Sequence, residues 1–167
     1  YFLLASAVFR DGLAAVFAFG GILAGTVFGL SFTEVILFAI GGNLVAGIGV
    51  LLSGWIDDKI GSKRVIVIAL AGLVLTGVGL FIFHDGGANA FWIGGLMLTF
   101  FVGPAQASAR AYLGHLAPEG QEGELFGLYA TTGRAISFLA PTLFALFVVL
   151  GGATYFGILG IVVVLLA

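Results

Sequence analysis

The sequence has no cysteine and very little charge. Only 8% of its 167 residues are Asp, Glu, Lys or Arg, whereas roughly a quarter of an ordinary globular domain is charged. The lack of cysteine excludes disulfides, thiolate chemistry and cysteine metal sites. Hydrophobic residues make up 61% of the chain, which is more than a water-soluble surface can cover. This composition predicts an integral membrane protein in contact with lipid.

Apolar runs long enough to cross a membrane follow one another along the chain. A spanning helix needs about 20 mostly apolar residues, and these runs lack the strict alternation of barrel strands. The first residue is not a methionine and the last apolar run ends with the sequence, so we expect a fragment of a longer chain. We predict an all-α membrane domain of six spans, at about residues 2–30, 35–56, 65–83, 91–113, 125–150 and 153–167.

The links between the spans predict how the helices begin and how they run. Ser31 and Glu34 have the spacing of a capping box, which predicts a helix start at this point. The links are short, so consecutive helices should be antiparallel. A bundle of six antiparallel helices would then place the 57–64 and 114–124 links at the same face of the membrane.

Basic residues predict the orientation of the bundle. Lys59, Lys63 and Arg64 lie in the 57–64 link, and Arg110 lies beside the 114–124 link. The other three links contain no Lys or Arg. Because basic loops remain in the cytoplasm, we expect both links and the amino terminus to be cytoplasmic. The expected location is a multi-pass protein of the cytoplasmic membrane.

The link after the second span carries a recognisable pattern. It resembles the signature loop of the major facilitator superfamily, in which glycine, aspartate, a basic residue, glycine and closing basic residues follow at fixed spacing. Asp57 and Ser62 depart from that pattern. The matching positions are Gly54, Asp58, Lys59, Gly61, Lys63 and Arg64.

Further segments resemble the carboxyl half of the vacuolar amino-acid effluxer-like subfamily. They are residues 10–12, 54–58, 101–107 and 126–130. This resemblance implies a secondary transporter that moves a small solute by alternating access, with amino-acid efflux as the suggested activity. The partners would be lipid, the solute and a missing amino-terminal six-helix half. The resemblance implies no nucleic acid and no cofactor, and it is compatible with proton coupling.

The resemblance also implies a gate at the signature loop. Asp58 would lie near the start of the fifth helix, whose free N–H groups attract an anion. Arg110 lies at the same membrane face and is a candidate partner for Asp58. A charge-assisted contact of this kind is strong enough to bias an equilibrium between two conformations.

Three charged residues lie deep within apolar runs, where a charge is costly and faces a partner or a cavity. Asp11 and Arg134 each lie about ten residues from the cytoplasmic end of a span, roughly 15 Å deep at 1.5 Å per residue. Their similar depth permits an ion pair. Arg10 lies beside Asp11 and points in a different direction. Both a structural pair and a substrate or proton site remain open.

Other features of the spans are polar or helix-breaking residues. Asn43 and Gln106 are candidate substrate contacts, although polar residues within spans more often join helices. Pro104 should kink the fourth span and free a carbonyl. The four-residue repeat of Gly21, Gly25 and Gly29 predicts a close-packing face on the first helix.

Two further classes compete with a transporter. A rhomboid-like intramembrane protease requires a Gly-x-Ser-Gly motif, and here Leu51 stands in place of its first glycine before Ser53. No histidine lies inside any predicted span, which argues against that enzyme. A purely structural membrane bundle remains an alternative.

Overall fold

The computed structural model describes residues 2–118 and 120–166, which fold as helices joined by short links. The predicted all-α membrane class is confirmed. The described part contains no strand. In chain order the helices are α1 (Phe2–Thr26), α2 (Phe32–Ile60), α3 (Ser62–Ile82), η1 (His84–Gly86), α4 (Gly87–Leu116), α5 (Glu122–Ile136), α6 (Leu139–Gly151), η2 (Thr154–Phe156) and α7 (Gly157–Leu166).

Five helical segments are long and apolar enough to cross a membrane. They include Glu122–Gly151, which combines α5 and α6, while the last helical segment, Thr154–Leu166, is shorter. Burial differs between the spans. In the most apolar stretches of α2 and of α5–α6 only 11% of residues are buried, compared with 33–39% in the other three. The faces of α2 and α5–α6 are therefore the most open surfaces of the bundle.

The link between α1 and α2 is held by the predicted capping box. The Ser31 N–H donates to the Glu34 carboxylate at 2.8 Å, and the Glu34 N–H donates to the Ser31 hydroxyl at 3.4 Å. These contacts satisfy backbone donors at the start of α2. The prediction that Gly29 belongs to a glycine face of the first helix is wrong. α1 ends at Thr26, and Gly29 lies in the turn after it with a φ of 69°.

The fifth span is interrupted near its middle. α5 ends at Ile136, α6 begins at Leu139, and two residues separate them. Pro141 lies in the first turn of α6 and has no N–H to donate to the Ser137 carbonyl, as a continuous helix would require. A proline is tolerated in a first turn, so Pro141 explains why a new helix starts here. The span expected over 125–150 is therefore built from two helices, α5 and α6.

Glycines bring α2 and α4 into close contact. A Cβ at Gly49 would collide with the Phe100 carbonyl oxygen and touch Pro104, and a Cβ at Gly103 would collide with the Ala46 carbonyl. The Phe100 carbonyl is the one that Pro104 leaves without its helical donor. It therefore faces the glycine of the neighbouring helix. α4 continues through Pro104 without a break.

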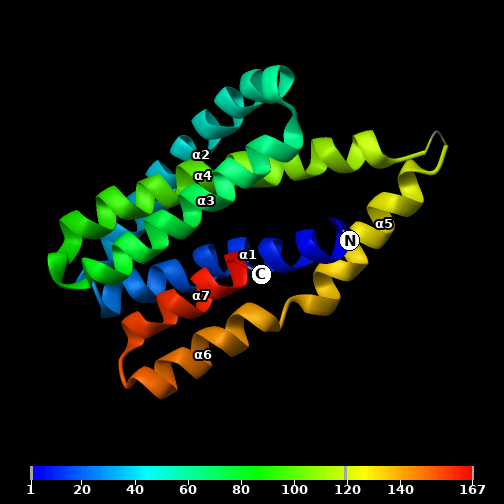
Figure 1. Ribbon diagram of the computed structural model, residues 1–167. Coiled ribbons are helices and arrows are strands. Elements are labelled where there is room, and N and C mark those ends of the chain that lie inside the picture. Colours follow the sequence, from blue (N-terminus) through cyan, green and yellow to red (C-terminus); the bar gives the residue numbers. More distant parts are fainter. Residues whose placement is uncertain (1, 119, 167) are drawn as a thin grey trace.

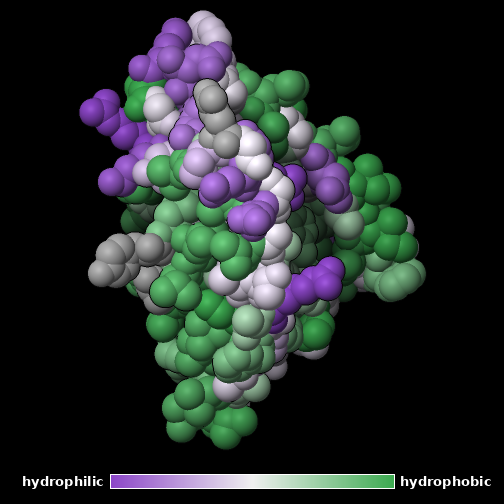
Figure 2. All heavy atoms as spheres, turned by 90° about the vertical axis from the view of Figure 1, so that its right-hand side faces the viewer, coloured by the Kyte–Doolittle hydropathy of each residue, from purple (hydrophilic) through white to green (hydrophobic). Residues whose placement is uncertain are grey.

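The links gather at two ends of the bundle (Figure 1). The α2–α3 link, the end of α4 and the start of α5 lie at one end, and the α1–α2, α3–α4 and α6–α7 links lie at the other. Asp57 and Lys63 line a common pocket with Tyr112 and His115, which supports this grouping. Figure 2 views the first of these ends and shows hydrophilic residues gathered on it, above a largely hydrophobic body.

Candidate functional site

Two adjacent charged residues of α1 contact both parts of the interrupted span. Arg10 is half-buried and Asp11 is only 6% exposed. Adjacent residues of a helix point in different directions. Arg10 therefore reaches α5 while Asp11 reaches α6. We call these two residues and their contacts the α1 bracket.

The Asp11 carboxylate binds the start of α6. The Ala140 N–H donates to Asp11 Oδ2 at 2.6 Å. Ala140 lies in the first turn of α6, where N–H groups lack partners within the helix and carry partial positive charge. A carboxylate at this point satisfies one of these donors and complements the helix dipole. The contact therefore offsets part of the cost of burying the Asp11 charge.

The Arg10 guanidinium binds the middle of α5. Its Nη1 donates to the Tyr129 carbonyl at 2.9 Å, and its Cζ lies 3.9 Å from the centroid of the Tyr129 ring. A Cβ at Gly133 would lie only 3.0 Å from Nη1, so the missing side chain leaves room for the guanidinium. Arg10 therefore contacts α5 through a hydrogen bond and a cation–π interaction.

Asp11 and Arg134 do not form the ion pair that their similar depth suggested. In residues 2–118 and 120–166 the only contact within 4 Å between a basic and an acidic side chain joins the His84 imidazole and Asp85. The expectation fails because the interruption of the fifth span offers Asp11 a backbone donor instead. Arg134 is exposed and lies on the opposite side of α5 from buried Tyr129.

The signature-loop residues lie at the hydrophilic end. Asp57, Asp58, Gly61, Ser62 and Lys63 border a pocket of about 460 Å³. The Ser62 hydroxyl donates to Asp57 Oδ2 at 3.0 Å, so the two residues that depart from the superfamily pattern bind each other. This bond joins the end of α2 to the start of α3.

The charged residues of this loop do not form the suggested latch. Within the part of the chain that the structure describes, Asp58 and Arg110 make no ion pair. The Lys59 ammonium lies 3.8 Å from the Trp55 ring centroid. Arg110 is exposed near the end of α4. Gly54 and Arg64 are exposed beside the loop.

The polar residues within the spans bond mainly to their own helices. The Asn43 amide donates to the Ala39 carbonyl at 2.7 Å, and the Thr132 hydroxyl donates to the Leu128 carbonyl at 2.8 Å. Both carbonyls lie four residues earlier, so neither bond joins two helices. Gln106 is half-buried in α4.

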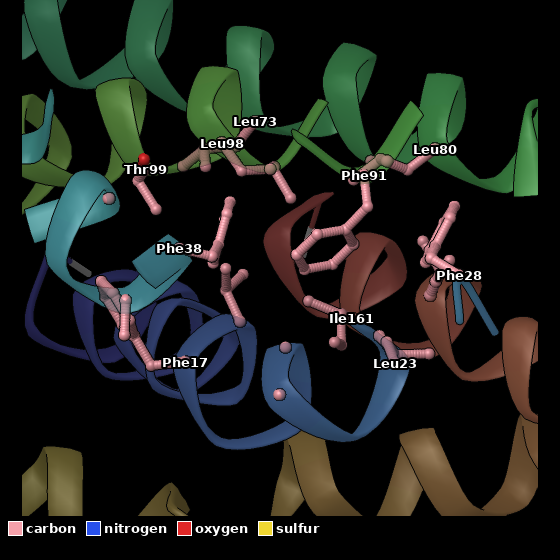
Figure 3. Close-up of a pocket in the computed structure, with 18 of the residues that line it drawn as sticks. Phe17, Leu23, Phe28, Phe38, Leu73, Leu80, Phe91, Leu98, Thr99 and Ile161 are labelled. Carbon is pink, nitrogen blue, oxygen red and sulfur yellow. The ribbon is translucent and has the colours of Figure 1, made fainter. Parts of the chain in front are cut away.

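An apolar pocket of about 250 Å³ lies among α1, α2, α3, α4 and α7 (Figure 3). Aromatic and aliphatic side chains point into it, and the polar side chains in its lining are Asn43 and Thr99. Their hydrogen bonds go to carbonyls of their own helices. The pocket therefore suits an apolar group better than a charged solute, and it does not include the α1 bracket. Its labelled lining residues are Phe17, Leu23, Phe28, Phe38, Leu73, Leu80, Phe91, Leu98, Thr99 and Ile161.

The whole chain, residues 1–167, matches the family described as vacuole effluxer Atg22 like. The chain belongs to this family. The match confirms the resemblance to the vacuolar effluxer-like transporters of the major facilitator superfamily. No curated protein and no solved structure matches the chain. For this member of the Atg22-like family, transport across a membrane is therefore the general function that the comparison supports.

Sequence reasoning missed the partners of the bracket. Ala140 contributes a backbone N–H, and Tyr129 contributes a backbone carbonyl besides its ring. Every residue has such backbone atoms, so these hydrogen bonds left no signal in the sequence. Gly133 matters because it lacks a side chain. Pro141 was the available signal, since a proline within a long apolar run indicates a helix boundary or a kink.

Proposed function

We propose that this member of the Atg22-like family is one half of a secondary transporter that moves a small solute by alternating access. Amino-acid efflux is the activity that the family description and the sequence resemblance favour. The observation that carries the proposal is the α1 bracket, because half-buried Arg10 and buried Asp11 of α1 contact the two sides of an interruption in a spanning helix. Interrupted spans are typical of transporter sites near the middle of the membrane.

The bracket ties the movement of α1 to that of α5 and α6. Arg10 contacts α5 and Asp11 contacts α6, and the two residues are neighbours in one helix. A tilt of α1 must then either carry both helices with it or break a charge-assisted contact. Conformations that differ by such contacts form the two-state equilibrium that alternating access requires.

The open faces of α2 and α5–α6 support the presence of a second half. Asn43 on α2 and Arg134 on α5 are exposed, and each lies more than ten residues from either end of its span. A polar or charged side chain at such depth is costly in lipid. These faces should therefore meet protein or a water-filled cavity, which the missing six-helix half would form.

Asp11 is the candidate for proton coupling. Within residues 2–118 and 120–166 it is the only acidic residue in the interior of a span, since the others lie at helix ends or in links. Protonation would remove the charge that holds the Ala140 N–H and would weaken the contact of α1 with α6. A proton could thereby shift the balance between conformations.

Uptake by proteoliposomes that contain the full-length protein tests the proposal. A panel of radiolabelled amino acids should show saturable uptake above protein-free liposomes for at least one member, and a pH gradient should change its rate. Asp11→Asn should abolish the effect of the gradient. The absence of uptake for every amino acid would contradict amino-acid transport, whereas hydrolysis of a membrane-embedded peptide would favour the intramembrane enzyme.

A further inference from the structure

Arg134 is a charged residue inside a span that takes no part in the α1 bracket. Away from their ends the spans contain two arginines, Arg10 and Arg134, and one acid, Asp11. Asp11 is engaged by the backbone of α6 and Arg10 by the backbone and ring of Tyr129. No carboxylate of the described residues lies within 4 Å of the Arg134 guanidinium.

The position of Arg134 makes lipid an unsuitable neighbour. It lies in the last turn of α5, just before the interruption, and it is exposed on the side opposite the face that packs on α1. A span of 30 residues, Glu122–Gly151, places it far from both membrane surfaces. A guanidinium at this depth needs water or an anion.

The hydroxyls near Arg134 are already engaged. Thr131 donates to the Gly127 carbonyl at 2.8 Å, and Ser137 donates to the Arg134 carbonyl at 2.8 Å. The first turn of α6 would otherwise attract an anion, but Asp11 occupies it. The guanidinium of Arg134 is therefore the group at the interruption that remains available to a negatively charged ligand.

We propose that Arg134 is the residue that binds the carboxylate of the transported solute and so determines selectivity for it. This inference rests on the proposed transport function and assigns the residue that recognises the solute. The planar guanidinium forms two parallel hydrogen bonds to a carboxylate, which gives both affinity and geometric selectivity. An amino-acid amide, in which the α-carboxylate is replaced by an uncharged carboxamide, has one acceptor oxygen in place of two and cannot form both bonds.

Competition between amino acids and their carboxamides tests this inference. Proteoliposomes with the full-length protein would be given radiolabelled leucine, glutamine or arginine, each with the unlabelled amino acid or its carboxamide as competitor. Wild-type uptake should be inhibited by the amino acid and much less by the carboxamide. Arg134→Gln should raise KM about tenfold or more, the loss expected for a charged hydrogen-bond donor, and should remove the difference between the competitors.

Two further variants make the experiment decisive. Arg134→Lys keeps the charge without the planar fork, so it should show a smaller rise in KM and retain the discrimination. Asp85→Asn removes a fully exposed charge of the α3–α4 link and should change neither quantity. If Arg134→Gln fails to reach the membrane, Arg134→Lys and the wild-type discrimination decide the question.

The outcomes separate this inference from the transport function. Uptake that does not distinguish an amino acid from its carboxamide would leave the transporter intact and overturn the role of Arg134. A KM for Arg134→Gln within about twofold of wild type would overturn it as well. No uptake of any of the three solutes by the wild-type protein would contradict amino-acid transport itself.

Discussion

The buried carboxylate of Asp11 in α1 accepts a hydrogen bond from the backbone N–H of Ala140, 129 residues later in the chain, at 2.6 Å. Ala140 is the second residue of α6, just after the interruption of the fifth span, and lies one residue before Pro141. The contact explains how a helix can start in the middle of a membrane. The proline removes one N–H, and the carboxylate binds another.

Replacing Asp11 should therefore destabilise the protein. Asp11→Ala leaves the Ala140 N–H unpaired in a buried position, which should cost about 1–3 kcal/mol. Asp11→Asn keeps an oxygen that accepts the bond and should cost less. Thermal unfolding of the purified full-length protein in detergent measures both losses. Asp85→Ala removes an exposed acid and serves as the control, and a loss as large as that of Asp11→Ala would contradict this role.

The second half of the bracket predicts a contrast between two substitutions of Tyr129. Tyr129→Phe keeps the ring beneath the Arg10 guanidinium and the backbone carbonyl that accepts its hydrogen bond. Tyr129→Leu removes the ring, and it should cost about 0.5–2 kcal/mol more, because a cation–π interaction is lost. The same unfolding assay measures the difference. Equal stability of the two variants would show that Arg10 gains nothing from the ring.

Close packing of α2 on α4 predicts that Gly49 tolerates no side chain. In Gly49→Ala the new methyl group would collide with the Phe100 carbonyl, so α2 and α4 must separate, at a cost of about 1–3 kcal/mol. Gly47→Ala is the matched control, since a Cβ at Gly47 has no neighbour within 4 Å. Unfolding temperature and monodispersity on size exclusion measure the effect. A Gly49→Ala protein as stable as the control would contradict the close approach.

The basic-residue asymmetry predicts which end of the bundle is cytoplasmic. The 167 residues contain no cysteine, so His115→Cys in the 114–124 link and Asp85→Cys in the α3–α4 link can each be labelled singly in an otherwise cysteine-free full-length protein. A membrane-impermeant thiol reagent should reach position 115 only from the cytoplasm and position 85 only from outside. Reversed labelling would invert the orientation, and the direction of transport with it.

The features predicted correctly from the sequence are those that neighbouring residues determine. Ser31 and Glu34 are three residues apart, so their spacing alone predicts the capping box that the structure contains. Long apolar runs without strict alternation likewise predict helices, because a helix satisfies its backbone hydrogen bonds within one segment. Gly29 was misplaced since small residues also end helices, and the repeat it shares with Gly21 does not show where the helix stops.

The partners of buried charges could not be predicted in the same way. Pairing Asp11 with Arg134 considered only charged side chains at similar depth. The structure satisfies Asp11 with a backbone N–H that exists because Pro141 restarts the helix. Arg10 similarly uses a backbone carbonyl, together with a ring and the space above Gly133. Such contacts depend on the relative placement of α1, α5 and α6, which the pattern of hydrophobic residues does not specify.

Alternating access itself is tested most directly at Thr131, which lies on the exposed side of α5 with Arg134. In the full-length, otherwise cysteine-free protein in sealed membranes, Thr131→Cys should react with an impermeant thiol reagent added from either side. A transported amino acid should slow both reactions. Leu75→Cys, on the exposed surface of α3, is the lipid-facing control and should react from neither side. Asp85→Cys should still be labelled normally from its own side. If Thr131→Cys then reacts from only one side, or from neither, the α5 face does not open alternately to the two sides of the membrane.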